Sequence, residues 1–327
     1  MEKVRWGVIS TANIAVKQVI PAMQKGKYAQ VVAIASRSLE KAQAAARELG
    51  LPKAYGSYDE LLADPQVDAV YNPLPNHLHV PWSIKALEAG KHVLCEKPLG
   101  LDAADARRLV EAARQRPRLK VMEAFMYRHH PQWKLACQLV QAGEIGELRT
   151  VHTFFSYYLV DPADVRNIAD IGGGGLLDIG CYAVSVARLL FESQPQRAFA
   201  SLDFDPQFKT DRLASGILDF GRGTSTFTVA TQLAYYQRVF IFGTQGKIEV
   251  EIPFNPPVDR PTRLFLQRGK ELRTHELPAC NQFTIQGDLF SQAILEDTPV
   301  PTPLEDGLAN MAVLDALFSS ARLGSWV

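Results

Sequence analysis

Hydrophobic positions in the first third of the chain fall into short continuous runs, and the stretches between them carry apolar residues at helical spacing. The short runs are rich in apolar and β-branched residues and predict strands at 3–9, 31–35, 67–71, 91–95 and 120–123. The stretches between them predict helices that begin near Ser10 and that cover 39–49, 58–62, 82–89 and 102–116. Strands and helices that alternate through short connections are typical of a doubly wound parallel α/β sheet.

The pattern changes after residue 122, because strands there follow one another with few helices between them. Strands are predicted at 148–158, 197–204, 213–220, 224–233, 237–242, 247–252 and 263–267, and helices at 132–142, 176–190, 282–295 and 305–323. Such runs of strands imply an open sheet that is largely antiparallel. We therefore expect a parallel-sheet domain over 1–122 and an α/β domain over 123–327, whose uncovered sheet face would form a homodimer.

Composition removes several classes of protein from consideration. The chain has 327 residues, and its 35 Lys and Arg balance its 35 Asp and Glu, which argues against nucleic acid or an anionic membrane as partner. The four cysteines are scattered without a C-x-x-C pair, so neither a metal site nor a disulfide framework is expected. The first predicted strand leaves no room for a secretory signal, and no apolar run approaches membrane-spanning length. We therefore expect a cytoplasmic protein.

The first strand–turn–helix is where a dinucleotide fingerprint is expected, but the three glycine positions of G-x-G-x-x-G are occupied by Ser10, Ala12 and Ala15. Ser10 and Ala12 are small enough to let the backbone approach a pyrophosphate, and the N-terminus of the following helix favours an anion. The alternative is an ordinary tight turn without a ligand.

The end of the second strand indicates which dinucleotide binds. A carboxylate at this position holds the ribose 2′-hydroxyl of NAD, but this chain has Ser36, Arg37 and Ser38, followed by Lys41. The guanidinium and the hydroxyl groups suit a 2′-phosphate. We therefore expect NADP, with NAD as the alternative; Arg37 could also simply cap the edge of the sheet.

Lys97 directly follows the strand at 91–95, so a parallel sheet would deliver it to the crevice where ligands bind. An ammonium group at that place can act as a fixed cation or, with a lowered pKa, as an acid or base. Pro98 can hold a cis bond that would aim the Lys97 side chain. His77 and His79 follow the preceding strand, where structural roles are as plausible as catalytic ones.

Three segments together resemble the glucose–fructose oxidoreductase / inositol dehydrogenase / MocA family: Cys95-Glu96-Lys97-Pro98-Leu99, Pro75-Asn76-His77-Leu78-His79 and the run from Gly173 to Tyr182. The segment Glu123–Pro131 is similar to the branch that contains NADP-linked D-xylose 1-dehydrogenases and dimeric trans-dihydrodiol dehydrogenases. The resemblance implies an N-terminal Rossmann domain and a C-terminal α/β domain that carries the substrate. The residues then expected to bind the cofactor are Ser10, Thr11, Ala12, Asn13, Ile14, Ser36, Arg37, Ser38, Lys41, Leu74, Pro75, Asn76, His79, Glu96 and Lys97.

Many relatives carry a histidine four residues after the Asp of the second motif, and this chain has Tyr182 there, so the usual catalytic histidine is absent. Asp178 and Tyr182 lie four residues apart on the predicted helix and share one face. A phenol with its ordinary pKa is a poor base at neutral pH, so Tyr182 would need a nearby cation, for which Lys97 is the candidate.

The sequence therefore predicts hydride transfer between a nicotinamide and a carbinol carbon of a sugar or polyol, with Lys97, Tyr182 and Asp178 as catalytic residues. The substrate is expected to contact Tyr127, Arg128, Tyr158, Asn167, Asp178 and Tyr182. Three alternatives stay open: a keto- or anhydrosugar reductase, a trans-dihydrodiol dehydrogenase, and an NADP-binding regulatory protein without turnover.

Overall fold

The structure is a computed structural model that describes residues 2–327, and its internal contacts divide the chain into two compact units. Of the described residues, the first unit comprises those up to Met126 together with Asn281–Leu308, and the second comprises Tyr127–Cys280 and Ala309–Val327. The domain limits expected from the sequence, 1–122 and 123–327, differ from these units chiefly in the segment 281–308.

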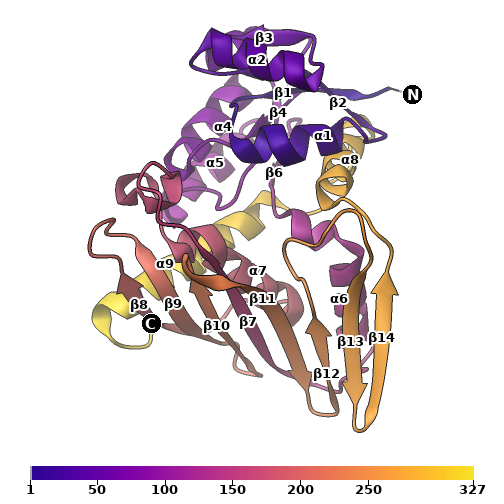
Figure 1. Cartoon of the computed structure of the whole chain (residues 1–327), viewed down its shortest axis with the longest axis vertical. Coiled ribbons are helices and arrows are strands. Elements are labelled where there is room, and N and C mark those ends of the chain that lie inside the picture. Colours follow the sequence, from indigo (N-terminus) through magenta and orange to yellow (C-terminus); the bar gives the residue numbers. More distant parts are fainter. Residues whose placement is uncertain (1) are drawn as a thin grey trace. The chain divides into compact units, whose positions relative to one another are not determined.

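The first unit contains a parallel six-stranded sheet in the order β3-β2-β1-β4-β5-β6 (Figure 1). This is the strand order of a Rossmann fold, so the expected fold class is confirmed. Its strands are β1 (Val4–Val8), β2 (Ala29–Ala35), β3 (Lys53–Tyr55), β4 (Ala69–Asn72), β5 (His92–Cys95) and β6 (Val121–Glu123). The edge strand β3 was not predicted, because three half-buried residues are too short to show a pattern.

Short helices connect these strands: η1 (Ala15–Val19), α1 (Ile20–Met23), α2 (Leu39–Leu49), α3 (Tyr58–Ala63), η2 (Asn76–Leu78), α4 (His79–Glu88) and α5 (Ala103–Arg114). Ser38, Ser57 and Asp102 cap α2, α3 and α5 by accepting a hydrogen bond from the backbone N–H three residues later. The predicted bounds of α2 and its cap at Ser38 are confirmed.

Helix α8 (Gln282–Leu295) belongs to the first unit because it packs on β1 and β2. The indole N–H of fully buried Trp6 donates to Ser291 Oγ at 3.0 Å, and Asp288 accepts from the backbone N–H groups of Lys27 and Tyr28. The sequence predicted this helix but assigned it to the other domain, because apolar periodicity does not reveal which sheet a helix covers.

The second unit contains an eight-stranded sheet in the order β14-β13-β12-β11-β7-β10-β9-β8, in which only β7 and β10 pair in parallel. Its strands are β7 (Leu148–Tyr158), β8 (Arg197–Phe204), β9 (Asp211–Asp219), β10 (Thr224–Ala230), β11 (Gln232–Gly243), β12 (Gly246–Val250), β13 (Thr262–Arg268) and β14 (Glu271–Leu277). The expected open, largely antiparallel sheet is confirmed. β14 was not predicted, because most of its residues are exposed and polar.

Burial alternates along the strands of this sheet. Val151, Thr153, Phe155, Val239 and Ile241 are buried, whereas His152, Phe154 and Phe240 are partly exposed. Helices α6 (Pro131–Gln141) and α7 (Cys181–Phe191) pack on the sheet, and α9 (Leu304–Leu323) is joined to β8 by a hydrogen bond from Ala200 N to Ser320 Oγ (Figure 1). The alternation is typical of a sheet with one covered face.

The segment Ala169–Phe191 corrects one expectation, because by length and composition it is apolar enough to cross a membrane. It contains η5 (Ala169–Ile171), η6 (Leu176–Gly180, a π-helical turn) and α7, and 89% of its most apolar window is buried inside the protein. A helix at the centre of a core needs the same composition as a membrane span.

Candidate active site

The loop after β5 presents Lys97, and hydrogen bonds fix the residues on both sides of it. The Tyr71 hydroxyl donates to Glu96 Oε1 at 2.6 Å, and the backbone N–H of Lys97 donates to Glu96 Oε2 at 3.3 Å. The peptide bond between Lys97 and Pro98 is cis, as the sequence allowed. A lysine held in this way at the carboxyl end of a parallel strand lies where such sheets bind their ligands.

His79 joins the loop after β4 to the loop that carries Lys97. Its Nδ1 lies 2.7 Å from the Pro98 carbonyl oxygen and its Nε2 lies 2.6 Å from the Leu74 carbonyl oxygen. Burial lowers the pKa of His79 to about 4, and the Lys97 ammonium also lowers it, whereas the two carbonyl oxygens act in the opposite direction. His79 is 1% exposed and lies between the two loops; its neutral ring donates to one of the two carbonyl oxygens and offers no polar atom to a cofactor.

The turn after β1 is closed by Ser10, whose hydroxyl accepts from the backbone N–H of Ala12 at 3.0 Å. The helix that begins with the next residues carries no acidic group in its first turn. Small side chains and an unopposed helix N-terminus fit a pyrophosphate, although the glycines of the usual fingerprint are missing.

The turn after β2 presents Arg37 between two serines. Ser36 is 8% exposed and its hydroxyl accepts from Ser38 N, while the Ser38 hydroxyl accepts from Lys41 N and so caps α2. Burial raises the pKa of the Tyr58 phenol, and the Arg37 guanidinium acts in the opposite direction. Arg37 and Tyr58 therefore lie close together. This cation, with no acid among these residues, fits the 2′-phosphate of NADP.

In the second unit, a run of glycines leads into the helix that carries Asp178 and Tyr182. The backbone N–H of Gly173 donates to the Ile168 carbonyl, and that of Gly174 donates to the Arg166 carbonyl. A Cβ atom on Gly173 would lie 2.6 Å from the Arg166 carbonyl oxygen, so the close approach of these two backbones requires glycine.

Asp178 lies at the centre of a polar cluster with Tyr157 and Arg166. Its Oδ2 accepts from the Tyr157 hydroxyl at 2.5 Å and from Arg166 Nε at 3.1 Å. The Asp178 charge raises the pKa of Arg166, and burial followed by this same charge raises the pKa of Tyr157. Tyr157 therefore stays protonated at neutral pH.

Tyr182 has a different environment, because aromatic rings surround it. Its ring centroid lies 5.0 Å from that of Phe254, 5.7 Å from that of Tyr127 and 6.0 Å from that of Phe155. The side chain is 5% exposed. Packing of this kind fixes the orientation of the phenol ring.

The other residues expected at the substrate site separate into two groups. Tyr127 is fully buried and donates to Ser185 Oγ at 2.7 Å, and Arg128 donates to the same oxygen. Both therefore support α7, and a buried Tyr127 ring leaves no surface for a sugar, which corrects that expectation. By contrast, Tyr158 is 68% exposed.

Asn167 is 4% exposed, and its Nδ2 donates to the Asp161 carbonyl oxygen at 2.8 Å. Its Oδ1 is buried and has no hydrogen-bond partner among residues 2–327. A buried oxygen without a donor is costly, so it suits acceptance of a hydroxyl hydrogen from a bound ligand.

Two residues of these clusters, Arg166 and Ser185, were not predicted from the sequence. Each contacts a candidate residue but carries no motif of its own. Only Arg166 gave a signal, as a lone cation in a segment that also contains Asp161, Asp164 and Asp170.

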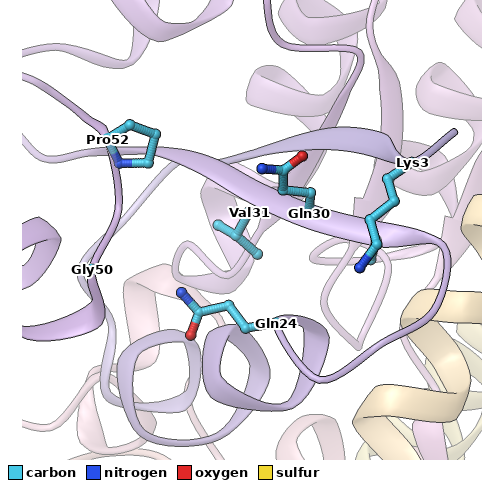
Figure 2. Close-up of a pocket in the computed structure, with 7 residues that line it drawn as sticks. Lys3, Gln24, Gln30, Val31, Gly50 and Pro52 are labelled. Carbon is cyan, nitrogen blue, oxygen red and sulfur yellow. The ribbon is translucent and has the colours of Figure 1, made fainter. Parts of the chain in front are cut away.

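A hollow of about 490 Å³ lies elsewhere on the first unit (Figure 2). Lys3, Gln24 and Gln30 line it together with Pro52, at the amino end of β2. Because ligands of parallel sheets bind at the carboxyl ends of the strands, this hollow is not the candidate active site.

Comparison with known proteins supplies the family. A family model described as "Oxidoreductase family, NAD-binding Rossmann fold" matches residues 4–125, and a model described as "GFO/IDH/MocA C-terminal domain" matches residues 133–249. The chain is 47% identical over 332 residues to an uncharacterized oxidoreductase, ORF334, of Rhizobium meliloti, with 100% of this chain and 99% of that protein covered.

Two further matches carry more specific names. A D-xylose 1-dehydrogenase (NADP(+)) of Haloferax volcanii is 36% identical over 327 residues, covering 98% of each chain. The crystal structure of KijD10, a 3-ketoreductase of Actinomadura kijaniata in complex with NADP and TDP-benzene, superimposes with a TM-score of 0.92 at 34% identity, covering 97% of this chain and 98% of that one.

Proposed function

The chain belongs to the Gfo/Idh/MocA family of oxidoreductases, and from this premise we propose that it transfers hydride between NADP and a hydroxyl-bearing carbon of a sugar or polyol. The observation that carries the proposal is Lys97, held after β5 by the Glu96 and His79 contacts in a Rossmann sheet of standard strand order. The aldose oxidation named for the Haloferax relative is the specific reaction proposed here.

NADP is the proposed cofactor. Arg37 and the serines beside it supply a cation and hydroxyl groups at the end of β2, where the 2′-phosphate of NADP would lie. The NADP-linked xylose dehydrogenase and the NADP complex of KijD10 support the same choice. The turn at Ser10–Ile14 would hold the pyrophosphate, and the loops at 74–76 and 96–97 would hold the nicotinamide half.

The chain's own residues position the alcohol and remove its proton, while the cofactor, when bound, accepts the hydride. In its ionised form, stabilised by the Lys97 ammonium, Tyr182 would take the hydroxyl proton of the substrate and become a neutral phenol, while the hydride leaves the carbon. In the reverse direction the same two groups return the proton to the carbonyl oxygen.

Asp178 does not act alone in this scheme, because Tyr157 and Arg166 already donate to one of its oxygens. We assign it the task of orienting the substrate as part of this cluster. Asn167 contributes a buried oxygen that can accept from a second hydroxyl of the sugar.

A reductase is the second candidate for the direction of the reaction, since KijD10 is a 3-ketoreductase. The same residues catalyse both directions, so only measured equilibria and substrates separate these two candidates. A trans-dihydrodiol substrate remains a further alternative, and a regulatory NADP-binding protein would show binding without turnover.

A second copy of the chain is the proposed occupant of the uncovered sheet face of the second unit. Phe154, Phe240 and Phe242 lie at alternate positions of β7 and β11 that the helices leave exposed or half-exposed. Arg238 and Glu249 form a 3.0 Å ion pair on the same face, so the patch carries both charges and can pair with itself. Light scattering on wild type and on Phe240→Glu tests this. A dimer that becomes a monomer in the variant is expected, and a monomeric wild type would contradict the proposal.

A cytoplasmic location is proposed for the chain as well.

The experiment that tests the function is a screen for reduced nicotinamide by its absorbance. Purified protein is given NAD or NADP with neutral pentoses, hexoses, inositols or dihydrodiols, and the reverse reaction is followed with keto sugars. Turnover of an aldose with NADP is expected. Binding of NADP without turnover of any of these compounds would support the regulatory alternative.

A further inference from the structure

Asp211, the first residue of β9, is a buried carboxylate that the proposed reaction does not use. It is 2% exposed, and its Oδ2 accepts from the backbone N–H of Leu176 at 2.6 Å. Burial raises the pKa of this carboxyl to about 7, while backbone N–H groups of Leu176, Asp211 itself and Gly175 act to lower it. Burying a carboxylate is costly, so its hydrogen bonds at this place indicate a definite task.

The glycine run is shaped around this carboxylate. Gly174 has a φ of +120°, a conformation that favours glycine, and a Cβ atom there would overlap with Asp211 Oδ1. The carboxylate thus occupies the space that the missing side chain leaves. It also lies at the N-terminal end of the helical segment, where a negative charge is favourable and the first N–H groups need an acceptor.

Two short series of contacts connect Asp211 to the groups proposed for catalysis. Leu176 is two residues before Asp178 in the same helical turn, so its amide fixes where that turn starts. In the other series, Gly174 N donates to the Arg166 carbonyl at 2.9 Å, and the Arg166 side chain donates to Asp178. All of these contacts lie within the second unit.

We propose that Asp211 is a positioning residue that fixes the glycine run and the first helical turn, and thereby places Asp178 and Tyr182 on the substrate. This inference rests on the proposed function, since it gives those two residues their role. Asn at position 211 would keep the shape of the side chain but turn an amide N–H toward the backbone donors that the carboxylate now satisfies.

The test compares Asp211→Asn with Asp203→Asn, a matched change at an exposed carboxylate on β8 that pairs only with Arg212 among the contacts described. Hydrogen exchange of the segment 172–182 is expected to accelerate in Asp211→Asn alone. The kcat is expected to fall at least about tenfold and the KM for the sugar to rise, because small misplacements of reacting groups are costly. The Kd for NADP should stay within about twofold in the same variant, since the cofactor loops belong to the other unit.

A merely structural role would lower the folded fraction and leave the sugar KM of the folded enzyme unchanged, and that result would overturn the proposal. Unchanged exchange in 172–182 would also overturn it. If Asp211→Asn does not fold, Asp211→Ser takes its place, because the shorter side chain withdraws the acceptor from Leu176 N and the same faster exchange of 172–182 is expected. Failure of the proposed function would instead appear as no sugar turnover by wild type, and the exchange measurement would still decide whether Asp211 positions the turn.

Discussion

The two units hold their chemical groups in different ways. In the first unit, Lys97 and Arg37 lie on loops that follow parallel strands, and side chains such as His79 and Ser36 fasten those loops. In the second unit, Asp178 and Tyr182 lie on one continuous helical segment, fixed by a buried carboxylate at its start and by packed aromatic rings. Binding of the cofactor and orientation of the sugar should therefore respond to separate sets of substitutions.

The largest expected effect is that of Lys97→Met. Removing the ammonium group takes away the charge that stabilises the ionised form of Tyr182, so kcat should fall by about 10³-fold or more. The Kd for NADP should change by less than about threefold, because the loops at Ser10 and Arg37 are untouched. Steady-state kinetics and cofactor fluorescence measure both quantities, with Lys25→Met as the control at an exposed position. An unchanged kcat would remove Lys97 from the mechanism.

Tyr182→Phe should have the next largest effect. The ring that packs against Phe254 and Tyr127 is retained, so folding should be unaffected, while loss of the hydroxyl should lower kcat by about 10²-fold. Tyr28→Phe, in the first unit, serves as the control. Retained turnover would mean that Lys97 or a water molecule transfers the proton.

Arg37→Glu tests the cofactor side of the comparison. Charge-assisted hydrogen bonds to a phosphate contribute about 1.5–3 kcal/mol, so the preference for NADP over NAD should fall by about 10- to 100-fold. The kcat at saturating cofactor should stay close to that of wild type. Arg47→Glu reverses an exposed charge in the same unit and should leave the preference unchanged. An unchanged preference in Arg37→Glu would place the 2′-phosphate elsewhere.

The smallest expected effect is on the pH dependence of stability, and its sign differs between the units. Burial alone would raise the pKa of Asp64, but hydrogen bonds from Lys53, Gln66 N and Tyr55 lower it to about 2, from 3.8. Its contribution, about 2 kcal/mol, is therefore present above pH 4 and lost as the pH falls toward 2. Because the pKa of Asp211 is raised to about 7, its contribution is present below pH 4 and lost as the pH rises through 7.

Thermal unfolding of wild type, Asp64→Asn and Asp211→Asn across this pH range measures both contributions. The difference between wild type and Asp64→Asn should shrink below pH 4. The difference between wild type and Asp211→Asn should change between pH 4 and 7. Parallel curves for all three proteins would contradict the assignments.

The sequence was a good guide to the first unit and a weaker one to the second. Rossmann loops follow strands at fixed places, so Lys97 and Arg37 could be located from the strands alone. Asp178 and Tyr182 were expected on one helix, whereas the structure places Asp178 in the π-helical turn η6 and Tyr182 in α7, with neighbours that were not predictable. Arg166 reaches Asp178 from another segment, and Asp211 comes from a strand 35 residues after Leu176. Contacts of this kind depend on tertiary packing, which local patterns do not encode.

The sequence also did not show which candidate side chains are buried. Tyr127 was expected to touch the substrate because it lies in the segment Glu123–Pro131, which resembles a branch of the family. In the structure its hydroxyl donates to Ser185 Oγ, and its ring packs against the ring of Tyr182.

The measurement that tests the central claim most directly is isotope transfer. The enzyme is given NADP and an aldose that carries deuterium on the carbon to be oxidised, and the reduced cofactor is analysed by mass spectrometry. We predict that the deuterium appears in the dihydronicotinamide ring, because hydride passes directly between the two carbons. Unlabelled reduced cofactor, with the deuterium released to water, would contradict the account.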